Sequence, residues 1–352
     1  MNSKPTNSIQ VLMPNLPEYF EENEFLLREL DIKGKKINQD ENAPLPRNSV
    51  LYCNNLEHWQ KRLVLSEAST ITVIIATNEY YKSEKWLEVN RIKSIKCAFI
   101  QYLPSNRRTK FGSIIKFIIH NPNFLYKKVF WQTTRNACRT YLDMRRMNFC
   151  IPVFGFPLGY SDRFVIELKN LGLMPGESIS LFEKEIYGKN LVRQPVSFIG
   201  QKGRWYRRLM VEYFERIAGA STSMYGSFGG FTHLPQTTDY ASSILSSKFV
   251  VCPPGNVSSQ SFRYYEAIAL GAVPIVTEVS LQDWNTHEYW PRNASWKNSN
   301  FIDVWISLKK LNEKALNSLV SELRFKISDE FSSTKALLRH CMEHDEAPRK
   351  RN

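Results

Sequence analysis

The chain has 352 residues, with 43% hydrophobic and 23% charged residues, values typical of a globular protein that buries a core rather than of a disordered or fibrous one. The net charge of +13 suits an anionic partner such as nucleic acid, anionic lipid or a phosphorylated small molecule. Apolar runs of about 18 residues are absent, so no membrane-spanning helix is expected. The start of the chain does not have the layout of a signal peptide, and six cysteines without a C-x-x-C pair favour reduced thiols in a cytoplasmic protein.

In the first half of the chain, apolar β-rich runs alternate with polar helical ones. The strand-like runs are "SVLYC" (49–53), "ITVIIAT" (71–77), "KCAFIQY" (96–102), "VFWQT" (129–133) and "CIPVFGF" (150–156). Strands that alternate with helices predict a parallel sheet with both faces covered by helices.

The second half repeats the alternation. A strand is expected at "VSFIG" (196–200), followed by a helix over 204–219 that carries Leu209, Tyr213 and Ile217 on one face and is closed by Gly219. The later elements are expected to be helices at "DYASSILSS" (239–247) and "SFRYYEAIALG" (261–271), strands at "KFVVC" (248–252) and "VPIVT" (273–277), and an amphipathic stretch over 301–344.

The simplest architecture for this pattern is α/β, with two doubly wound, Rossmann-like domains facing a cleft. We expect an N-terminal, acceptor-side domain over 1–160, a connector over 161–194 and a C-terminal domain over 195–325. The terminal helix, about 325–345, is expected to pack back on the first domain.

The segment between the last two expected strands carries chemistry. After "KFVVC", the turn "PPG" lets a ligand approach the backbone, and the polar run "NVSSQS" supplies hydroxyl caps for the next helix. Arg263 lies in the first turn of that helix, where a cation is unfavourable for the helix dipole unless an anion is bound there. Glu266 lies one turn later and suits a bidentate contact with a ribose diol. The alternative is an ordinary surface ion pair between Arg263 and Glu266.

A second basic loop follows an earlier strand. In "SFIGQKGRWYRR" a strand ends at Gly200, and Lys202, Arg204 and Arg207 follow it. Backbone N–H groups and these cations could hold a pyrophosphate, although basic residues at such turns are often only solvated.

These two segments resemble a known family. The stretch "SSILSSKFVVCPPGNVSSQSFRYYEAIALGAVPIV" resembles the signature of exostosin-type glycosyltransferases, in which "C-P-x-G" is followed by a Ser before "F/Y-R", then "E-A" and "P-V". The second segment is similar to the "F-x-G…R" segment of the same family, with Arg207 at the matching distance from Gly200. "VFGFPLGY" (153–160) is similar to the ribitol xylosyltransferase branch, although Asn78 stands where those relatives carry Asp.

The resemblance implies a GT-B fold, a UDP-sugar donor held mainly by the C-terminal domain, and inversion at the anomeric carbon. It also implies no essential metal, so no cofactor is expected, and a hydroxyl of a cell-surface, capsular or lipid-linked glycan is the expected acceptor. The expected donor-binding residues are Gly200, Lys202, Arg204, Arg207, Pro253, Gly255, Ser261, Arg263, Tyr264 and Glu266. Inverting transfer needs a base for the acceptor hydroxyl, and Glu79 and Glu278, each beside a strand end, are the candidates, with His233 in reserve.

Several alternatives remain open. The chain could be a non-catalytic nucleotide- or glycan-binding subunit, or a basic nucleic-acid-binding protein, although it has no zinc-finger spacing or RNP-like motif and we expect no nucleic-acid partner. The segment 106–128 mixes Lys and Arg with Ile and Phe, so it is either a core helix or an interfacial segment that docks on the inner face of an anionic membrane. His340 and His344 have a spacing that metals can use, but a solvated helix end is the favoured interpretation.

Overall fold

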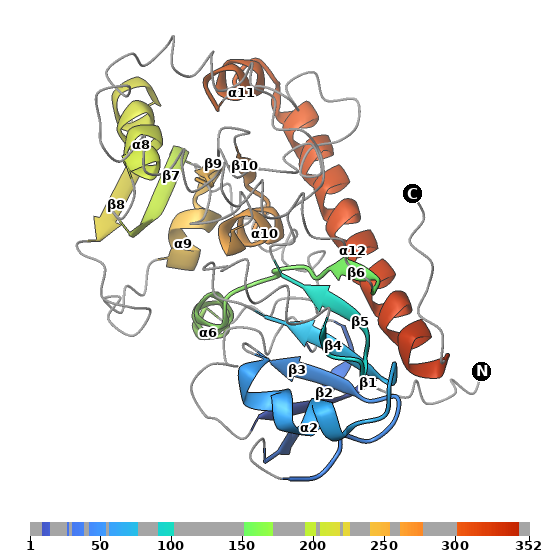
Figure 1. Cartoon of the computed structure of the whole chain (residues 1–352). Coiled ribbons are helices and arrows are strands. Elements are labelled where there is room, and N and C mark those ends of the chain that lie inside the picture. Colours follow the sequence, from blue (N-terminus) through green and yellow to red (C-terminus); the bar gives the residue numbers. More distant parts are fainter. Residues whose placement is uncertain are drawn as a thin grey trace. The chain divides into compact units, whose positions relative to one another are not determined.

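The computed structural model of the chain describes residues 9–14, 27, 30–38, 42–53, 56–76, 91–101, 151–171, 194–201, 205–218, 221–225, 240–253, 261–276 and 301–344. These residues form two compact units (Figure 1). Unit 1 comprises the described residues of Met1–Leu103, Arg139–Leu158 and Ser328–Asn352, and unit 2 comprises those of Gly159–Ile327. Among the described helices, none combines the length and the apolar composition that a bilayer crossing requires.

Unit 1 is built on a parallel sheet whose described strands follow the order β2-β1-β3-β4-β5-β6. The strands are β1 (Ile9–Pro14), β2 (Ile32–Ile37), β3 (Val50–Cys53), β4 (Ile71–Ile75), β5 (Ile95–Ile100) and β6 (Val153–Gly155). Every pairing between them is parallel. The parallel sheet predicted from the apolar runs is therefore confirmed.

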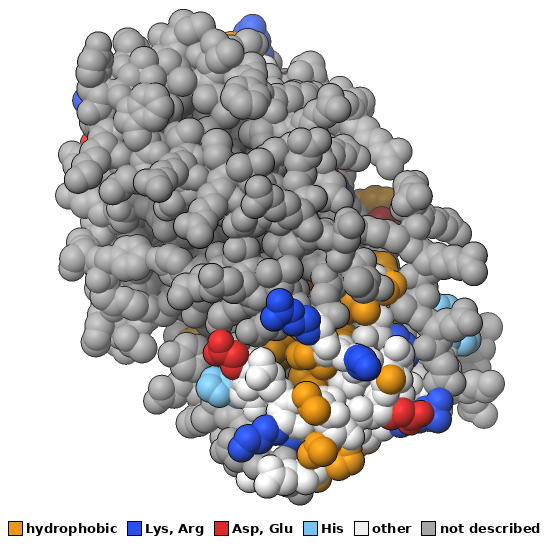
Figure 2. Space-filling view, in the orientation of Figure 1, with side chains coloured by type: hydrophobic (Ala, Val, Ile, Leu, Met, Phe, Trp, Pro, Cys, Tyr) orange, Lys and Arg blue, Asp and Glu red, His pale blue; other side chains and the backbone are white. Residues whose placement is uncertain are grey.

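One face of this sheet packs on a short helical segment, η2 (Glu57–Trp59) continuing into α2 (Gln60–Leu65). Alternate residues of each strand point to this face, because successive side chains of a strand lie on opposite sides. The cluster is formed by Leu51, Cys53, Ile71, Val73, Ile75, Ala98 and Ile100 of the sheet together with Trp59 and Leu63 of the helical segment. Val64 and Leu65 of α2 are exposed. In Figure 2 the described surface shows Lys and Arg side chains among apolar ones.

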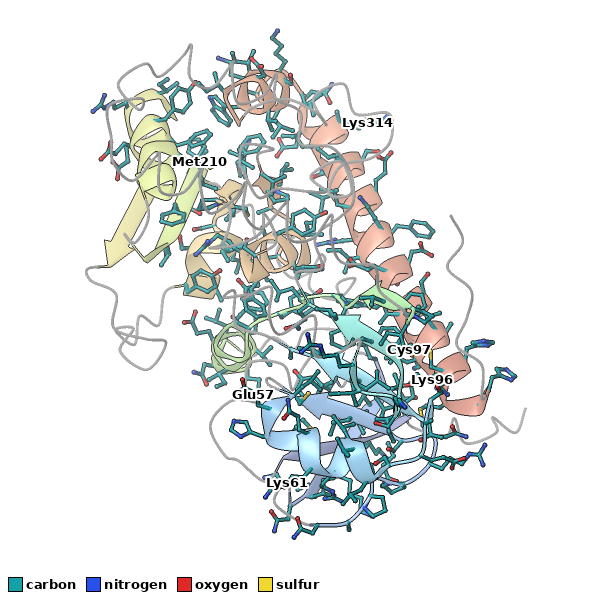
Figure 3. All side chains as sticks on the ribbon, viewed as in Figure 1. Glu57, Lys61, Lys96, Cys97, Met210 and Lys314 are labelled. Atoms are coloured by element: carbon teal, nitrogen blue, oxygen red, sulfur yellow. The ribbon has the colours of Figure 1, made fainter. Side chains whose placement is uncertain are left out.

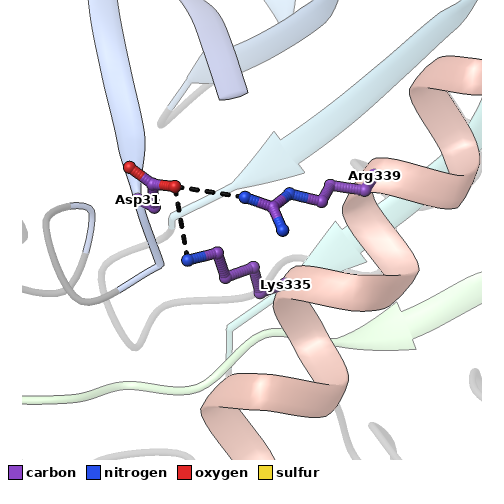
Figure 4. A network of polar contacts seen from close by, with 3 residues as sticks. All are labelled: Asp31, Lys335 and Arg339. Atoms are coloured by element: carbon purple, nitrogen blue, oxygen red, sulfur yellow. Dashed lines mark hydrogen bonds and ion pairs between the residues drawn. The ribbon is translucent and has the colours of Figure 1, made fainter. Parts of the chain in front are cut away.

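The C-terminal part of α12 (Glu313–Glu343) belongs to unit 1, whereas its residues up to Ile327 belong to unit 2. Its buried residues in unit 1, Phe331, Thr334, Leu338 and Cys341, recur at spacings of three and four and form one helical stripe. Cys341 contacts Cys97 on β5, so this stripe packs on the sheet face opposite to α2. Asp31 also holds the helix: its carboxylate accepts a hydrogen bond from Arg339 (3.1 Å) and forms an ion pair with Lys335 (3.3 Å) (Figure 4).

Unit 2 contains a second parallel sheet with the described order β10-β9-β7-β8. Its strands are β7 (Gln194–Gln201), β8 (Ser221–Tyr225), β9 (Ser247–Val251) and β10 (Val273–Ile275). The helices of the unit are α6 (Asp162–Asn170), α8 (Trp205–Ala218), α9 (Tyr240–Leu245), α10 (Phe262–Ala269), α11 (Phe301–Leu308) and the first part of α12. Helix α6 lies within 161–194, the range predicted as a connector, and its residues belong to this unit.

Aromatic side chains fill part of the core of unit 2. Trp305 of α11 lies edge-on to Phe214 of α8 and to Phe249 of β9, with ring centroids 5.5 and 5.3 Å apart. The buried residues of α8 include Met210, Val211 and Phe214 (Met210 is labelled in Figure 3), whereas Ile217 is 55% exposed. The predicted apolar face through Tyr213 and Ile217 is therefore wrong, because the apolar face of the helix is displaced by about one residue.

The described strands and helices otherwise follow the predicted runs to within a few residues. The amphipathic stretch over 301–344 is interrupted between α11 and α12, so it forms two helices rather than one. Three strands were not predicted: β1, β2 and β8. Strand β2 has the sequence IKGKKI with exposed lysines and lies at the sheet edge, where charged side chains commonly protect unpaired backbone groups and obscure the apolar pattern.

Candidate functional site

The candidate site lies where β7 and β9 end. After β7 the chain passes to β8 on one side and then returns to β9 on the other side of β7, so β7 and β9 flank the point where the strand order reverses. Ligands of open parallel sheets bind outside the carboxyl ends of the strands at such a switch point. Pro253, which follows β9, is buried, and α10 begins after the loop that continues from it.

Arg263 of α10 contacts the end of β7. Its Nη2 donates a hydrogen bond to the carbonyl oxygen of Ile199 on β7 (2.8 Å), and its guanidinium carbon lies 4.8 Å from the centre of the Phe198 ring. The Nε atom is buried and has no hydrogen-bond partner among the described residues. A buried donor without an acceptor costs about 1–3 kcal/mol, so an anionic ligand that accepted from Nε would remove that cost.

Ser261 is the N-cap residue of α10, but its side chain does not cap the helix. Its Oγ is buried and, within the described part of the chain, has no hydrogen-bond partner. The capping predicted from the run "NVSSQS" is therefore not made by this hydroxyl. The first turn of α10 contains no acidic residue, so the positive end of the helix, the unused hydroxyl and the Arg263 guanidinium together form a suitable environment for an anion.

Gly200 lies against the same guanidinium. A Cβ atom at this position would be 2.7 Å from Arg263 Nη2 and 2.8 Å from Phe198 Cζ. These distances are shorter than any ordinary Cβ contact, so only glycine lets β7 approach the guanidinium this closely.

Glu266 is buried one turn further along α10, with 1% of its surface exposed. Its carboxylate accepts hydrogen bonds from the Ser161 backbone N–H (3.1 Å) and hydroxyl (2.5 Å) and from the Tyr240 hydroxyl. The alternative of a surface ion pair between Arg263 and Glu266 is wrong, because this carboxylate is not on the surface.

The environment of Glu266 also perturbs its ionisation. Burial raises the pKa of the Glu266 carboxyl, while the hydrogen bonds from Ser161 and Tyr240 and the Arg263 charge act in the opposite direction. Burial, followed by the nearby Glu266, raises the pKa of Tyr240 well above its ordinary value. The carboxylate therefore connects α10 to the start of α9 and to Ser161, the N-cap residue of α6.

The structure places Gly200 against Arg263, with Ser261 at the start of the same helix. Glu266 was predicted to hold a ribose diol, but its carboxylate is buried one turn deeper and bonds to Ser161 and Tyr240 instead. Tyr264 is buried and packs edge-on against Tyr265 with ring centroids 5.3 Å apart. Arg207 lies on α8, but its side chain is outside the described residues. The predictions for Glu79, Glu278, Lys202, Arg204, Gly255, His233, Asn78 and the segment 106–128 also lie outside them.

Three contributors to this environment were not predicted from the sequence: Phe198, Ser161 and Tyr240. Phe198 was placed in a strand, but nothing in a strand pattern indicates that its ring packs against a cation. Ser161 accepts a hydrogen bond from Phe164 N–H (3.4 Å), and a serine before a helical run is a capping signal that could have drawn attention to it. Its bond to Glu266 spans 105 residues, so no local signal predicts it.

The described residues contain no group of three or more His, Cys, Asp or Glu side chains arranged to hold a metal ion. The rings of His340 and His344 lie with centroids 4.3 Å apart at the end of α12 in unit 1. The spacing considered from the sequence thus brings the two rings together without a third ligand among the described residues.

Comparison with known proteins identifies the fold. No family model and no curated protein matches the chain. A crystal structure of an α1,3-fucosyltransferase with GDP matches with a TM-score of 0.50 and 10% identity, over 97% of this chain and 93% of that one. A structure of an α1,3-fucosyltransferase without a named ligand matches with a TM-score of 0.46 and 11% identity, over 97% of this chain and 93% of that one. A structure with GDP-fucose matches with a TM-score of 0.46 and 12% identity, over 98% of this chain and 93% of that one. At such identities the likeness shows the fold alone, and the predicted GT-B fold of two Rossmann-like units is confirmed.

Proposed function

We propose that the chain is a glycosyltransferase that moves a sugar from a nucleotide-sugar donor to a hydroxyl group. The observation that carries this proposal is the environment of Arg263 at the β7–β9 switch point. There, a guanidinium is fixed by the Ile199 carbonyl and the Phe198 ring, and its buried Nε has no hydrogen-bond partner among the described residues beside the N-terminus of α10. A diphosphate supplies the negative charge and the acceptor oxygens that this arrangement lacks.

Charge development in the reaction gives Arg263 its role. When the bond between the sugar and the diphosphate breaks, negative charge grows on the leaving diphosphate, and a fixed cation with oriented donors stabilises that charge. Arg263, the α10 N–H groups and the Ser261 hydroxyl would serve this purpose, and Gly200 leaves room for the guanidinium. Glu79 and Glu278 stay our predictions for the base that deprotonates the acceptor hydroxyl.

The finer assignment rests on the sequence motifs. The resemblance to exostosin-type enzymes, and within them to the ribitol xylosyltransferase branch, supports a UDP-sugar donor, inversion at the anomeric carbon and a glycan acceptor without an essential metal. The fucosyltransferase crystals with GDP and GDP-fucose support a nucleoside diphosphate sugar as the donor class. The nucleobase is therefore best tested with UDP and GDP side by side.

The test is nucleotide binding by an Arg263→Ala variant, measured by calorimetry. A hydrogen bond to a charged group contributes about 1.5–3 kcal/mol, so UDP or GDP should bind roughly 10- to 150-fold more weakly than to the wild type. Arg216→Ala is the matched control, since Arg216 is an exposed arginine of the same unit. Unchanged nucleotide affinity in the Arg263→Ala variant would overturn the proposal, and binding without transfer or donor hydrolysis would instead favour a non-catalytic binding subunit.

A further inference from the structure

Two buried thiols in unit 1 lie in direct contact. Cys97 of β5 and Cys341 of α12 are separated by 244 residues in the chain, yet their Sγ atoms are 3.3 Å apart. Both side chains are fully buried, and both cysteines are free (Cys97 is labelled in Figure 3). Since a disulfide bond is about 2.05 Å long, the two sulfur atoms need to move by little more than 1 Å to become bonded.

Polar contacts on both sides of Cys341 fix its position. The Lys96 ammonium, itself buried next to Cys97, donates hydrogen bonds to the backbone carbonyls of Cys341 and His344 (2.8 Å for the latter). The Cys341 carbonyl belongs to the last turn of α12 and His344 follows the helix directly, at the end whose unpaired acceptors and negative dipole favour a cation. Asp31 holds the preceding turns through Lys335 and Arg339. The thiol pair is therefore set in place by the fold rather than by a chance side-chain rotation.

The surroundings of Cys97 also favour its reactive form. Contact with the Cys341 thiol lowers the pKa of Cys97 against the effect of burial, and the Thr72 hydroxyl at 3.5 Å and the Lys96 charge act in the same direction. The same contact raises the pKa of Cys341, so Cys97 is the thiol of the pair that ionises first. In contrast, burial raises the pKa of Cys53, another buried cysteine of unit 1, to about 12. The thiolate is the form of cysteine that reacts with oxidants, so the two sites should differ in reactivity.

We propose that Cys97 and Cys341 form an intramolecular disulfide when the folded protein meets a small peroxide oxidant, and that this modification fastens the end of α12 to β5. In the first step, the Cys97 sulfur attacks one oxygen of hydrogen peroxide, the O–O bond breaks, and a sulfenic acid and hydroxide form. In the second step, the Cys341 sulfur attacks the Cys97 sulfur and displaces hydroxide. The protons of the two thiols end in water, so two thiols and one peroxide give one disulfide and two waters.

Access of the oxidant is consistent with the position of the pair. Cys341 lies two residues before the end of α12 at Glu343, and the ends of helices open more readily than their interiors. Hydrogen peroxide is close to water in size, so a small local opening is sufficient. The proposal concerns unit 1 and does not depend on the proposed nucleotide site in unit 2.

The test is peptide mapping of the intact protein after treatment with hydrogen peroxide and quenching. A peptide pair linking Cys97 to Cys341, lighter by two hydrogen atoms than the reduced pair, is expected, and a dithiol reductant should remove it. The oxidised protein should also melt at a higher temperature than the reduced protein, because the cross-link closes a loop of 244 residues. In Cys97→Ser and in Cys341→Ser, peroxide treatment should no longer raise the melting temperature above that of the untreated variant. In Cys53→Ala, the same treatment should still raise it.

The mapping result decides the question even where a variant folds poorly. If both cysteines of the oxidised wild type remain open to alkylation after denaturation, the pair does not form a disulfide and the proposal is wrong. A melting shift that persists in Cys97→Ser would equally overturn it, since another modification would then be responsible.

Discussion

Gly200→Ala is the most specific test of the geometry around Arg263, because it adds a single methyl group and removes no functional side chain. The new Cβ would lie 2.7 Å from Arg263 Nη2 and 2.8 Å from Phe198 Cζ, so at least one of these groups must move. The backbone of Gly200 is outside the left-handed region, so the effect of the substitution is steric rather than conformational.

The expected magnitude follows from the contacts that are displaced. Overpacking of this kind costs about 1–3 kcal/mol of folding free energy. Moving the guanidinium also breaks its 2.8 Å hydrogen bond to Ile199 and shifts its remaining donors away from a bound diphosphate. If one charge-assisted contact to the nucleotide is lost, affinity should fall by about 1.5–3 kcal/mol, which corresponds to roughly 10- to 150-fold in Kd.

Two measurements separate these effects: urea unfolding for stability and calorimetry with UDP and GDP for binding. Gly155→Ala is the matched control, because a Cβ on this β6 residue would have no atom within 4 Å and should change stability by less than about 0.5 kcal/mol. A folded Gly200→Ala protein that binds nucleotide as well as Gly155→Ala does would refute the reasoning that Arg263 is positioned for a diphosphate.

Three further predictions concern stability. Arg324→Ala removes hydrogen bonds to two carbonyls at the C-terminal end of α10 (3.1 and 3.3 Å), so a urea titration should show a free energy of unfolding lower by about 1–2 kcal/mol. The control is the neighbouring Phe325→Ala, whose side chain is 76% exposed and whose loss should cost less than about 0.5 kcal/mol in the same titration. The pKa of Glu266 is raised in the folded state, so the folded protein binds this proton more tightly than the unfolded chain does. The unfolding free energy of the wild type, measured relative to Glu266→Gln, should therefore fall as pH rises from below 4.5 through the folded-state pKa. A difference that does not change with pH would contradict this assignment. Asp31→Asn should lower the free energy of unfolding by about 0.5–1 kcal/mol, because the partly exposed ion pairs with Lys335 and Arg339 of α12 are lost. Asn tolerates the positive φ of 56° at this position, so the backbone should not contribute. The loss should be smaller in high salt, and an equal loss at all salt concentrations would count against this explanation.

The sequence by itself determined the class of fold and the position of the key cation. Apolar runs of strand length separated by amphipathic helices encode a parallel sheet covered on both faces, because burial on both sides removes the polar alternation that one-sided strands show. The same reasoning placed Arg263 in the first turn of a helix that follows a strand, where its charge opposes the helix dipole. That local conflict indicated an anion site before any tertiary contact was known.

Only the tertiary structure decided which groups surround that cation. The Ile199 carbonyl lies 64 residues from Arg263 in sequence, and Ser161 lies 105 residues from Glu266. Periods of two and 3.6 residues encode which side of an element is buried, but not which strand lies next to which. The order β10-β9-β7-β8 brings the ends of β7 and β9 together, and no pattern in either strand specifies that order.

The unpredicted elements have the same physical origin. Strand β2 and the contact between Cys97 and Cys341 depend on pairings between distant segments, whose closure costs entropy that local propensity does not reveal. Burial of Glu266 is likewise a property of three helices that come together, so the sequence alone could equally have described an exposed carboxylate. Local patterns thus indicate where strands and helices form, whereas the packing of distant elements determines which of their residues are buried and which polar groups those residues meet.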